Sequence, residues 1–139
     1  MNNLLHLVRG LPGSGKSTFA RSLKYDNSFL VEADLYFTKD GKYNFDYSLL
    51  NEAHEWCFSE TENALMNGKN VIVSNTFVSK RFILRYFNLA KKLNVGFELT
   101  DLFDSGLTDE ELVKRNLHSV PLDVISNMRR KYEKWTPTT

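Results

Sequence analysis

The sequence predicts an α/β fold, in which a mainly parallel sheet of four or five strands carries helices on both faces. Short apolar runs alternate along the chain with longer amphipathic stretches, and a glycine-rich loop joins the first run to the first stretch. Strands that alternate with helices are joined by right-handed crossovers, which make neighbouring strands parallel. In such sheets ligands bind beyond the carboxyl ends of the strands, so functional residues are expected in the loops that follow them.

Four short runs have the apolar character of buried strands. The first ends at the glycine-rich loop, and the third is rich in β-branched residues. These strands are expected at residues 4–8, 29–32 and 71–73, with a fourth within residues 94–101. An aromatic segment, residues 34–46, follows the second strand. Its secondary structure is left open, although its Asp40-Gly41 pair indicates a turn.

Five amphipathic stretches predict helices. Asn67-Gly68 is a stop signal, Thr108 and Glu111 have the spacing of a capping box, and Pro121 is suited to the first position of a helix. The helices are expected at residues 16–25, 46–67, 80–93 and 108–118, followed by a last helix that Pro121 opens.

The length of 139 residues fits one domain that spans residues 1–139. No apolar run approaches the ~20 residues of a membrane span, and the short N-terminal segment lacks the pattern of a signal peptide, which favours a cytoplasmic protein. Cys57 is the single cysteine, so no internal disulfide can form, and the residue is expected to pack in the core.

The net charge of +1 does not indicate a polyanionic partner, but the charges are unevenly distributed. Residues 32–62 contain eight acidic side chains, whereas residues 79–92 contain five basic side chains and no acidic one. Two interpretations remain open: two solvated helix faces, or a basic wall along which a phosphate-bearing substrate lies.

The glycine-rich loop matches the phosphate-binding pattern G-x-x-x-x-G-K-[ST] in full, between a predicted strand and a predicted helix. Its backbone N–H groups are expected to cradle phosphate oxygens, and the fold is therefore expected to be that of a P-loop NTPase. Lys16 is expected to reach the β- and γ-phosphates of a nucleotide, and Ser17 to offer its hydroxyl to Mg²⁺. The loop consists of Gly10, Leu11, Pro12, Gly13, Ser14, Gly15, Lys16 and Ser17.

Asp34 follows the second predicted strand, on the same sheet edge as the P-loop. A carboxylate there can accept the proton of a substrate hydroxyl or help to hold Mg²⁺. The alternative is that Asp34 only caps a short helix that begins at Leu35. Glu32, two residues earlier, is expected to lie inside the strand and to have no catalytic role.

The third strand often ends in the acidic Walker B residue that holds Mg²⁺, but here it runs into Ser74-Asn75-Thr76. These residues could hold only a metal-bound water. His54, in the middle of the long helix, is expected to be structural.

Arg115 lies on the polar helix after the fourth strand. As part of a lid near residues 108–118, its guanidinium could grip nucleotide phosphates in a bidentate manner. The alternative is a surface ion pair with Glu110 or Glu111. The cluster Arg129, Arg130 and Lys131 is expected to be solvated.

These residues together resemble the polynucleotide-kinase-like P-loop ATPases, which include the kinase domains of bacteriophage polynucleotide kinases. The resemblance implies ATP-dependent phosphorylation of a hydroxyl, with Asp34 as general base and Arg115 on the lid. Three features depart from the family. Phe37 replaces a substrate-binding arginine, Ser74-Asn75-Thr76-Phe77 stands where the family has Asp-Asn-Thr-Asn, and no second lid arginine lies between Asn116 and Pro121. The resemblance rests on residues 9–18, including Thr18, and on residues 34–36, 52–56, 71–76, 111–116 and 120–125.

The sequence therefore predicts an ATP- and Mg²⁺-dependent phosphotransferase, with a polynucleotide 5′-hydroxyl among its candidate acceptors. One alternative is an ATP-binding module with weak ATPase activity that acts through a partner, which exposed Phe37 and Phe77 side chains and the missing Walker B acid would favour. Another is a kinase for a nucleoside or other small molecule, with Phe37 stacked on a base.

Overall fold

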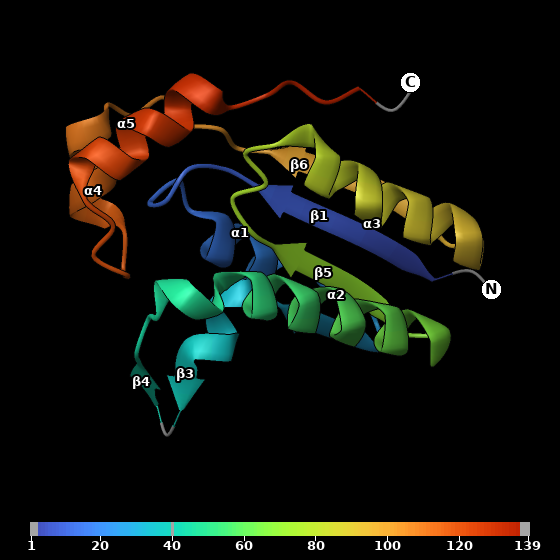
Figure 1. Ribbon diagram of the computed structural model, residues 1–139. Coiled ribbons are helices and arrows are strands. Elements are labelled where there is room, and N and C mark those ends of the chain that lie inside the picture. The colour runs from blue at the N-terminus through green and yellow to red at the C-terminus, as the bar shows by residue number, and fades with distance from the viewer. Residues whose placement is uncertain (1–2, 40, 137–139) are drawn as a thin grey trace.

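A parallel four-stranded sheet forms the centre of the molecule (Figure 1). The computed structural model describes residues 3–39 and 41–136. The strand order is β2-β5-β1-β6, and each neighbouring pair is parallel. The predicted α/β fold with a parallel sheet is confirmed. The strands are β1 (Leu4–Arg9), β2 (Ser28–Val31), β5 (Asn70–Ser74) and β6 (Gly96–Asp101).

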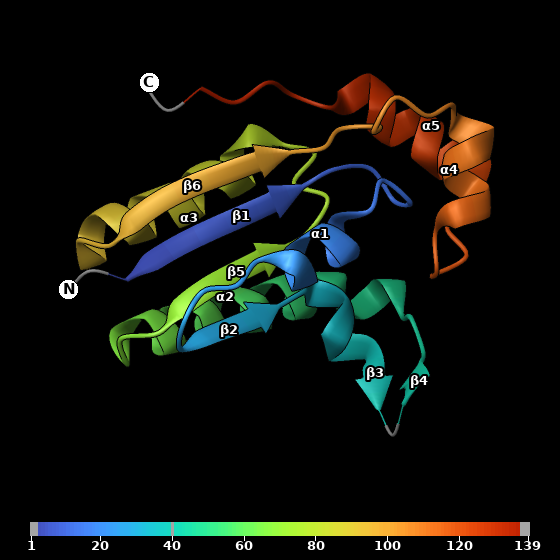
Figure 2. The same cartoon turned by 180° about the vertical axis from the view of Figure 1, so that it is seen from behind.

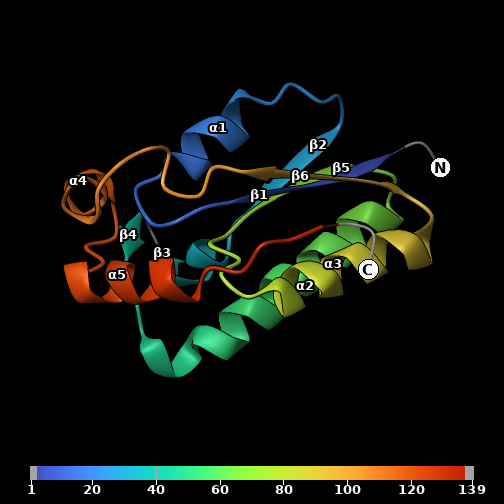
Figure 3. The ribbon, with the colours of Figure 1, turned by 90° about the horizontal axis from the view of Figure 1, so that it is seen from above.

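Helices cover both faces of the sheet, as Figures 2 and 3 show. The short helix α1 (Lys16–Ser22) lies on one face, and α2 (Leu50–Met66) and α3 (Lys80–Leu93) lie side by side on the other. The larger core lies between the sheet and α2 and α3, and it includes Cys57, as expected. A smaller core of Val8, Ala20 and Ile72 lies under α1.

Helices α1 and α2 are each shorter at one end than the sequence predicted. The helix α1 ends at Ser22 rather than near residue 25, because the chain turns back so that the Tyr25 hydroxyl lies 2.8 Å from His6 Nδ1 in β1. The helix α2 begins at Leu50 rather than at Asp46. The 3₁₀ turn η2 (Tyr47–Leu49) precedes it, and the Asp46 side chain caps this turn by accepting from Ser48 N.

The aromatic segment after β2 forms a 3₁₀ helix and a small hairpin. These elements are η1 (Ala33–Phe37), β3 (Thr38–Lys39) and β4 (Lys42–Tyr43). Asp40 of the expected turn lies outside the described residues, and Gly41 has a left-handed backbone with φ of 76°. Phe37 is 5% exposed and packs against Tyr36, Tyr43 and Phe45, so aromatic packing holds this segment together.

The C-terminal part of the chain forms two short helices, α4 (Asp109–Arg115) and α5 (Leu122–Lys131). The predicted capping box of Thr108 and Glu111 is present at the start of α4. The helix ends at Arg115, before residue 118, because the Asn116 side chain bonds the backbone of Val113 and Val120 and folds the following loop. Pro121 is the N-cap of α5, not its first helical residue.

The prediction that the basic cluster on α5 is solvated is wrong for Arg129. Its guanidinium contacts Asp104 Oδ2 at 2.6 Å and Asp109 Oδ1 at 2.8 Å, and it donates to the Leu107 carbonyl. Arg129 therefore fastens α5 to the start of α4 and to the loop before it. No helix within residues 3–39 and 41–136 is both long enough and apolar enough to span a bilayer.

Candidate phosphoryl-transfer site

The P-loop connects β1 to α1, in the strand–loop–helix context that the motif predicts. Gly13 and Gly15 have left-handed backbones, with φ of 83° and 96°. Glycine adopts this conformation without steric cost. A Cβ atom on Gly13 would lie only 2.4 Å from the Leu112 carbonyl oxygen, so glycine is also needed there for the close approach of α4.

The P-loop is held in place by the segment that carries α4. Leu11 N donates to the Phe103 carbonyl at 2.8 Å, and the Ser105 hydroxyl donates to the Ser14 carbonyl at 2.6 Å. Leu11 also forms a fully buried cluster with Leu112 and Ile125. The candidate lid thus packs on the phosphate loop and fixes its shape.

Lys16 lies at the start of α1 with two carboxylates nearby. Burial lowers the pKa of its ammonium group to about 8, although the charges of Asp34 and Glu32 oppose this effect. Its Nζ donates to the Leu11 carbonyl at 3.2 Å. The lysine is therefore largely charged at neutral pH, and the polar groups around it could bind phosphate and a cation.

Glu32 does not lie inside the strand, as the sequence suggested, because β2 ends at Val31. Its carboxylate accepts a hydrogen bond of 2.7 Å from the Ser17 hydroxyl, the group that the motif assigns to Mg²⁺. Its side chain does not cap the 3₁₀ helix that follows. Glu32 is thus a candidate site residue that the sequence analysis rejected. Its position at the carboxyl end of a strand was the signal that could have identified it.

Asp34 lies in the first turn of η1, where its side chain makes no capping bond, so the alternative capping role is wrong. Its Oδ1 accepts from the Tyr43 hydroxyl at 3.3 Å, and its Oδ2 lies 3.4 Å from His118 Nε2. The His118 ring packs on Tyr43 with 4.1 Å between centroids. The Asp34 side chain keeps 46% of its surface exposed and is accessible to a substrate. No sequence signal indicated His118, which lies in the loop between α4 and α5.

Arg115 ends α4 beside the P-loop. Its Nη2 atom lies 3.7 Å from the position that a Cβ on Gly15 would occupy. The side chain is exposed, and Glu111, its proposed surface partner, instead closes the capping box through Thr108 N. Of the other P-loop residues, Pro12 and Ser14 are buried, whereas Thr18 is exposed on α1.

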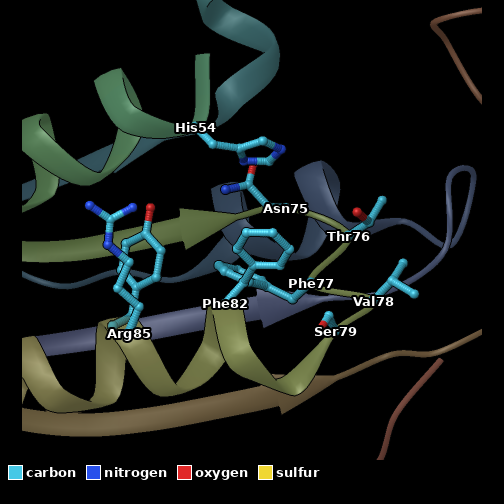
Figure 4. A pocket seen from close by; sticks show the side chains of 9 residues that line it. His54, Asn75, Thr76, Phe77, Val78, Ser79, Phe82 and Arg85 are labelled. Carbon is cyan, nitrogen blue, oxygen red and sulfur yellow. The ribbon is translucent and has the colours of Figure 1, made fainter. Parts of the chain in front are cut away.

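A pocket of about 130 Å³ opens between α2, α3 and the loop that follows β5 (Figure 4). His54 stacks on Phe82 at its wall, and Asn75 joins it to the site because its Oδ1 accepts from Ala33 N, next to Asp34. Burial lowers the pKa of His54, an effect that the charge of Asp34 opposes, so its imidazole is neutral at pH 7. Phe77 also lines the pocket but is only 5% exposed.

The acidic and basic stretches of the sequence face one another on α2 and α3. Arg85 pairs with Glu55 at 2.7 Å, and Lys92 lies 3.7 Å from Glu62. Part of the expected basic wall is therefore neutralised within the protein. Lys80 and Arg81 are exposed at the end of α3 that borders the pocket.

Comparison with known proteins shows a family match over most of the chain. The family model described as AAA domain matches residues 5–135. Human NEDD4-binding protein 2 is 35% identical over 137 residues, which cover 95% of this chain and 8% of that protein. A protein of Acanthamoeba polyphaga mimivirus, described as a bifunctional polynucleotide phosphatase/kinase, is 32% identical over 133 residues, or 88% of this chain and 27% of that protein. This chain thus spans only a small part of these relatives.

Solved structures share the fold. The Pnkp1/Rnl/Hen1 RNA repair complex contains a chain that matches with a TM-score of 0.70 and 22% identity, over 94% of this chain and 44% of that one. A gluconokinase from Sinorhizobium meliloti 1021 matches with a TM-score of 0.62 and 15% identity, over 96% and 75%. The predicted P-loop fold and the resemblance to polynucleotide-kinase-like proteins are confirmed.

Proposed function

The chain belongs to the AAA domain family of kinase-like P-loop proteins, and we propose that it transfers the γ-phosphate of ATP to a hydroxyl, with a polynucleotide 5′-hydroxyl as the favoured acceptor. The observation that carries this proposal is the position of Asp34. Its accessible carboxylate, held by Tyr43 and His118, lies near enough to Lys16 to influence the lysine pKa.

The P-loop supplies the phosphate site in this proposal. Its backbone N–H groups and Lys16 bind the β- and γ-phosphates, and the Arg115 guanidinium beside Gly15 stabilises the charge that develops during transfer. The donor set near Lys16 fits Mg²⁺, because it contains the Ser17 hydroxyl and two carboxylates. Phosphate oxygens would complete the octahedron. Ser17 is the proposed protein ligand, and Asp34 faces the acceptor hydroxyl instead of the cation. The bound cation would neutralise phosphate charge.

Asp34 acts as the general base. Its carboxylate accepts the proton as the acceptor O–H bond breaks, and the acceptor oxygen bonds to the γ-phosphorus while the bond to the β–γ bridging oxygen breaks and ADP leaves. Tyr43 donates to one carboxylate oxygen and His118 lies against the other, so both residues hold the base in one orientation.

Two observations favour a polynucleotide acceptor. The pocket beside Asn75 is walled by the stacked rings of His54 and Phe82, and the Arg81 guanidinium lies 5.0 Å from the centre of the Phe82 ring. Aromatic surfaces next to cations are typical of sites for single-stranded nucleic acids. In addition, one relative is described as a polynucleotide phosphatase/kinase.

The alternatives lose the aromatic features that favoured them, although the acid after β5 is absent. Phe37 and Phe77 are each only 5% exposed, so they form no aromatic edge for a partner protein. Phe37 lies in the aromatic core of the hairpin and cannot stack on the base of a nucleoside. Neither the partner-dependent ATP-binding module nor the nucleoside kinase is therefore proposed.

The experiment is phosphate transfer from γ-labelled ATP with Mg²⁺ to a panel of acceptors. The panel contains 5′-hydroxyl DNA and RNA oligonucleotides, the same oligonucleotides with 5′-phosphates, nucleosides, gluconate and water. We expect label on the 5′-hydroxyl oligonucleotides only, and none with Lys16→Ala. Label on a small molecule alone would replace the polynucleotide acceptor, and ATP binding without any transfer would refute the phosphotransferase proposal.

A further inference from the structure

We propose that Glu32, which directly follows β2, takes the place of the missing Walker B carboxylate after β5 and orients Ser17 for Mg²⁺. The inference rests on the Mg²⁺–nucleotide site of the proposed function but not on the identity of the acceptor. It assigns a role to a residue that the motif does not include, and it explains how the site can lack an acid after β5.

The strand β5 ends in Ser74, a polar residue without a charge. Ser74 is 3% exposed, and its hydroxyl has no hydrogen-bond partner within residues 3–39 and 41–136. Burial of a hydroxyl without a partner costs free energy. The sheet thus keeps a polar side chain where a carboxylate would ordinarily stand, while the negative charge must come from elsewhere.

Strand register places Glu32 beside that position. The strands β2 and β5 are parallel, and their last pair is Val31 with Val73. The residues that follow are Glu32, just beyond the end of β2 but still extended, and Ser74, the last residue of β5. Side chains alternate between the two faces of a strand. Val31 and Val73 belong to the core under α2 and α3, whereas Leu30 and Ile72 pack toward α1. Glu32 and Ser74 therefore both point to the α1 face.

That face carries the P-loop serine. Ser17 is the second residue of α1, and its hydroxyl donates to Glu32 Oε1 at 2.7 Å. When a hydroxyl offers its lone pairs to a cation, its hydrogen must point away from the cation. A carboxylate is the strongest acceptor for that hydrogen. Hydrogen bonds of this kind orient metal ligands and contribute to metal affinity. Glu32 also adds a negative charge close to the cation.

The test measures nucleotide affinity by calorimetry with and without Mg²⁺, using ADP and a non-hydrolysable ATP analogue. Glu32→Gln keeps the size of the side chain but removes its charge. We expect the Mg²⁺-dependent gain in affinity to fall about 10- to 100-fold, with the metal-free affinity unchanged or higher. Glu62→Gln, which removes an equal charge from α2, is the matched control and should behave as the wild type. Electron paramagnetic resonance of Mn²⁺ gives a second measure of the loss.

A second test moves the carboxylate from position 32 to position 74. Glu32→Ser should lose the Mg²⁺-dependent gain, and the double variant Glu32→Ser/Ser74→Asp should recover most of it, because the acid returns to the neighbouring strand. A purely structural role of Glu32 predicts no such recovery. The proposal is overturned if Glu32→Gln keeps the full gain, or if the double variant folds and does no better than Glu32→Ser. Normal Mg²⁺-dependent binding without transfer to any acceptor would refute only the proposed function.

Discussion

Lys16 combines burial with a positive charge, and this combination makes nucleotide binding sensitive to pH. Its pKa of about 8 lies below the ordinary value of 10.5, so the free protein loses this proton as the pH rises through 8. A phosphate requires the charged form, so binding above pH 8 must take up a proton. We expect ATP affinity to fall up to about tenfold per pH unit above 8. Calorimetry in buffers of different ionisation enthalpy measures the proton uptake, and constant affinity from pH 7 to 9.5 would contradict this origin of the shift.

The same burial makes Lys16 costly for folding. The unfolded chain binds the proton more tightly than the folded one, so the contribution of Lys16 to stability improves as the pH rises from about 8 to 10.5 and is least favourable below 8. Lys16→Met should therefore raise the free energy of unfolding at pH 7, by up to about 3 kcal/mol, while it abolishes ATP binding. Urea denaturation at pH 7 and pH 10 checks the sign of the stability change and the pH range over which it occurs. A variant that is less stable than the wild type at pH 7 would contradict the proposed cost of burying Lys16.

Among the elements, α4 depends on its N-terminal cap. Thr108 and Glu111 satisfy backbone N–H groups at the start of a helix of only 7 residues, and Leu112 of this helix packs on the P-loop. Thr108→Ala should destabilise α4 by about 1 kcal/mol. The measurement is hydrogen exchange, which should speed up about fivefold in residues 109–115. Ser59→Ala on the exposed face of α2 is the control, and unchanged exchange in α4 would show that packing alone holds this helix.

At the same scale, the elements that the sequence predicted best are those with a local signal. The strands and α3 follow from apolar periodicity, and the cap of α4 follows from the spacing of Thr108 and Glu111. The hairpin after β2 was not predictable, because aromatic contacts of Phe37 hold it together rather than a backbone pattern.

The site followed the same rule. The motif located the P-loop, and the position after β2 placed Asp34 at the correct edge. The Ser17–Glu32 bond depends on strand register, and the contact of His118 with Asp34 joins residues 84 positions apart in the chain. Arg129 was misjudged because its partners, Asp104 and Asp109, precede it by 25 and 20 residues. Contacts over such separations have no signature in one sequence.

For the whole molecule, Arg9 is a central connection. Its side chain is fully buried, and it joins Asp101 of β6 at 3.2 Å, the Phe77 carbonyl at 2.7 Å and the Tyr132 ring at 3.9 Å. Arg9→Met should lower the free energy of unfolding by about 3 kcal/mol, because Asp101 Oδ2 and the Phe77 carbonyl lose the guanidinium that donates to them. Chemical denaturation measures the change, with exposed Arg21→Met as control. A loss below ~1 kcal/mol would mean that this network does not hold the sheet to the C-terminal segment.

The carboxyl edge of the sheet brings the P-loop, Glu32, Asp34 and the pocket beside Asn75 together, and α4 and α5 close the same end (Figure 1). The central claim is that this edge transfers phosphate, with Asp34 as its base. The most direct measurement is the single-turnover rate of Asp34→Asn with γ-labelled ATP and a 5′-hydroxyl oligonucleotide, together with its ATP affinity. We predict a rate that is lower by about 10²- to 10⁴-fold and an ATP affinity within about twofold of the wild type. A wild-type rate in this variant would contradict the claim.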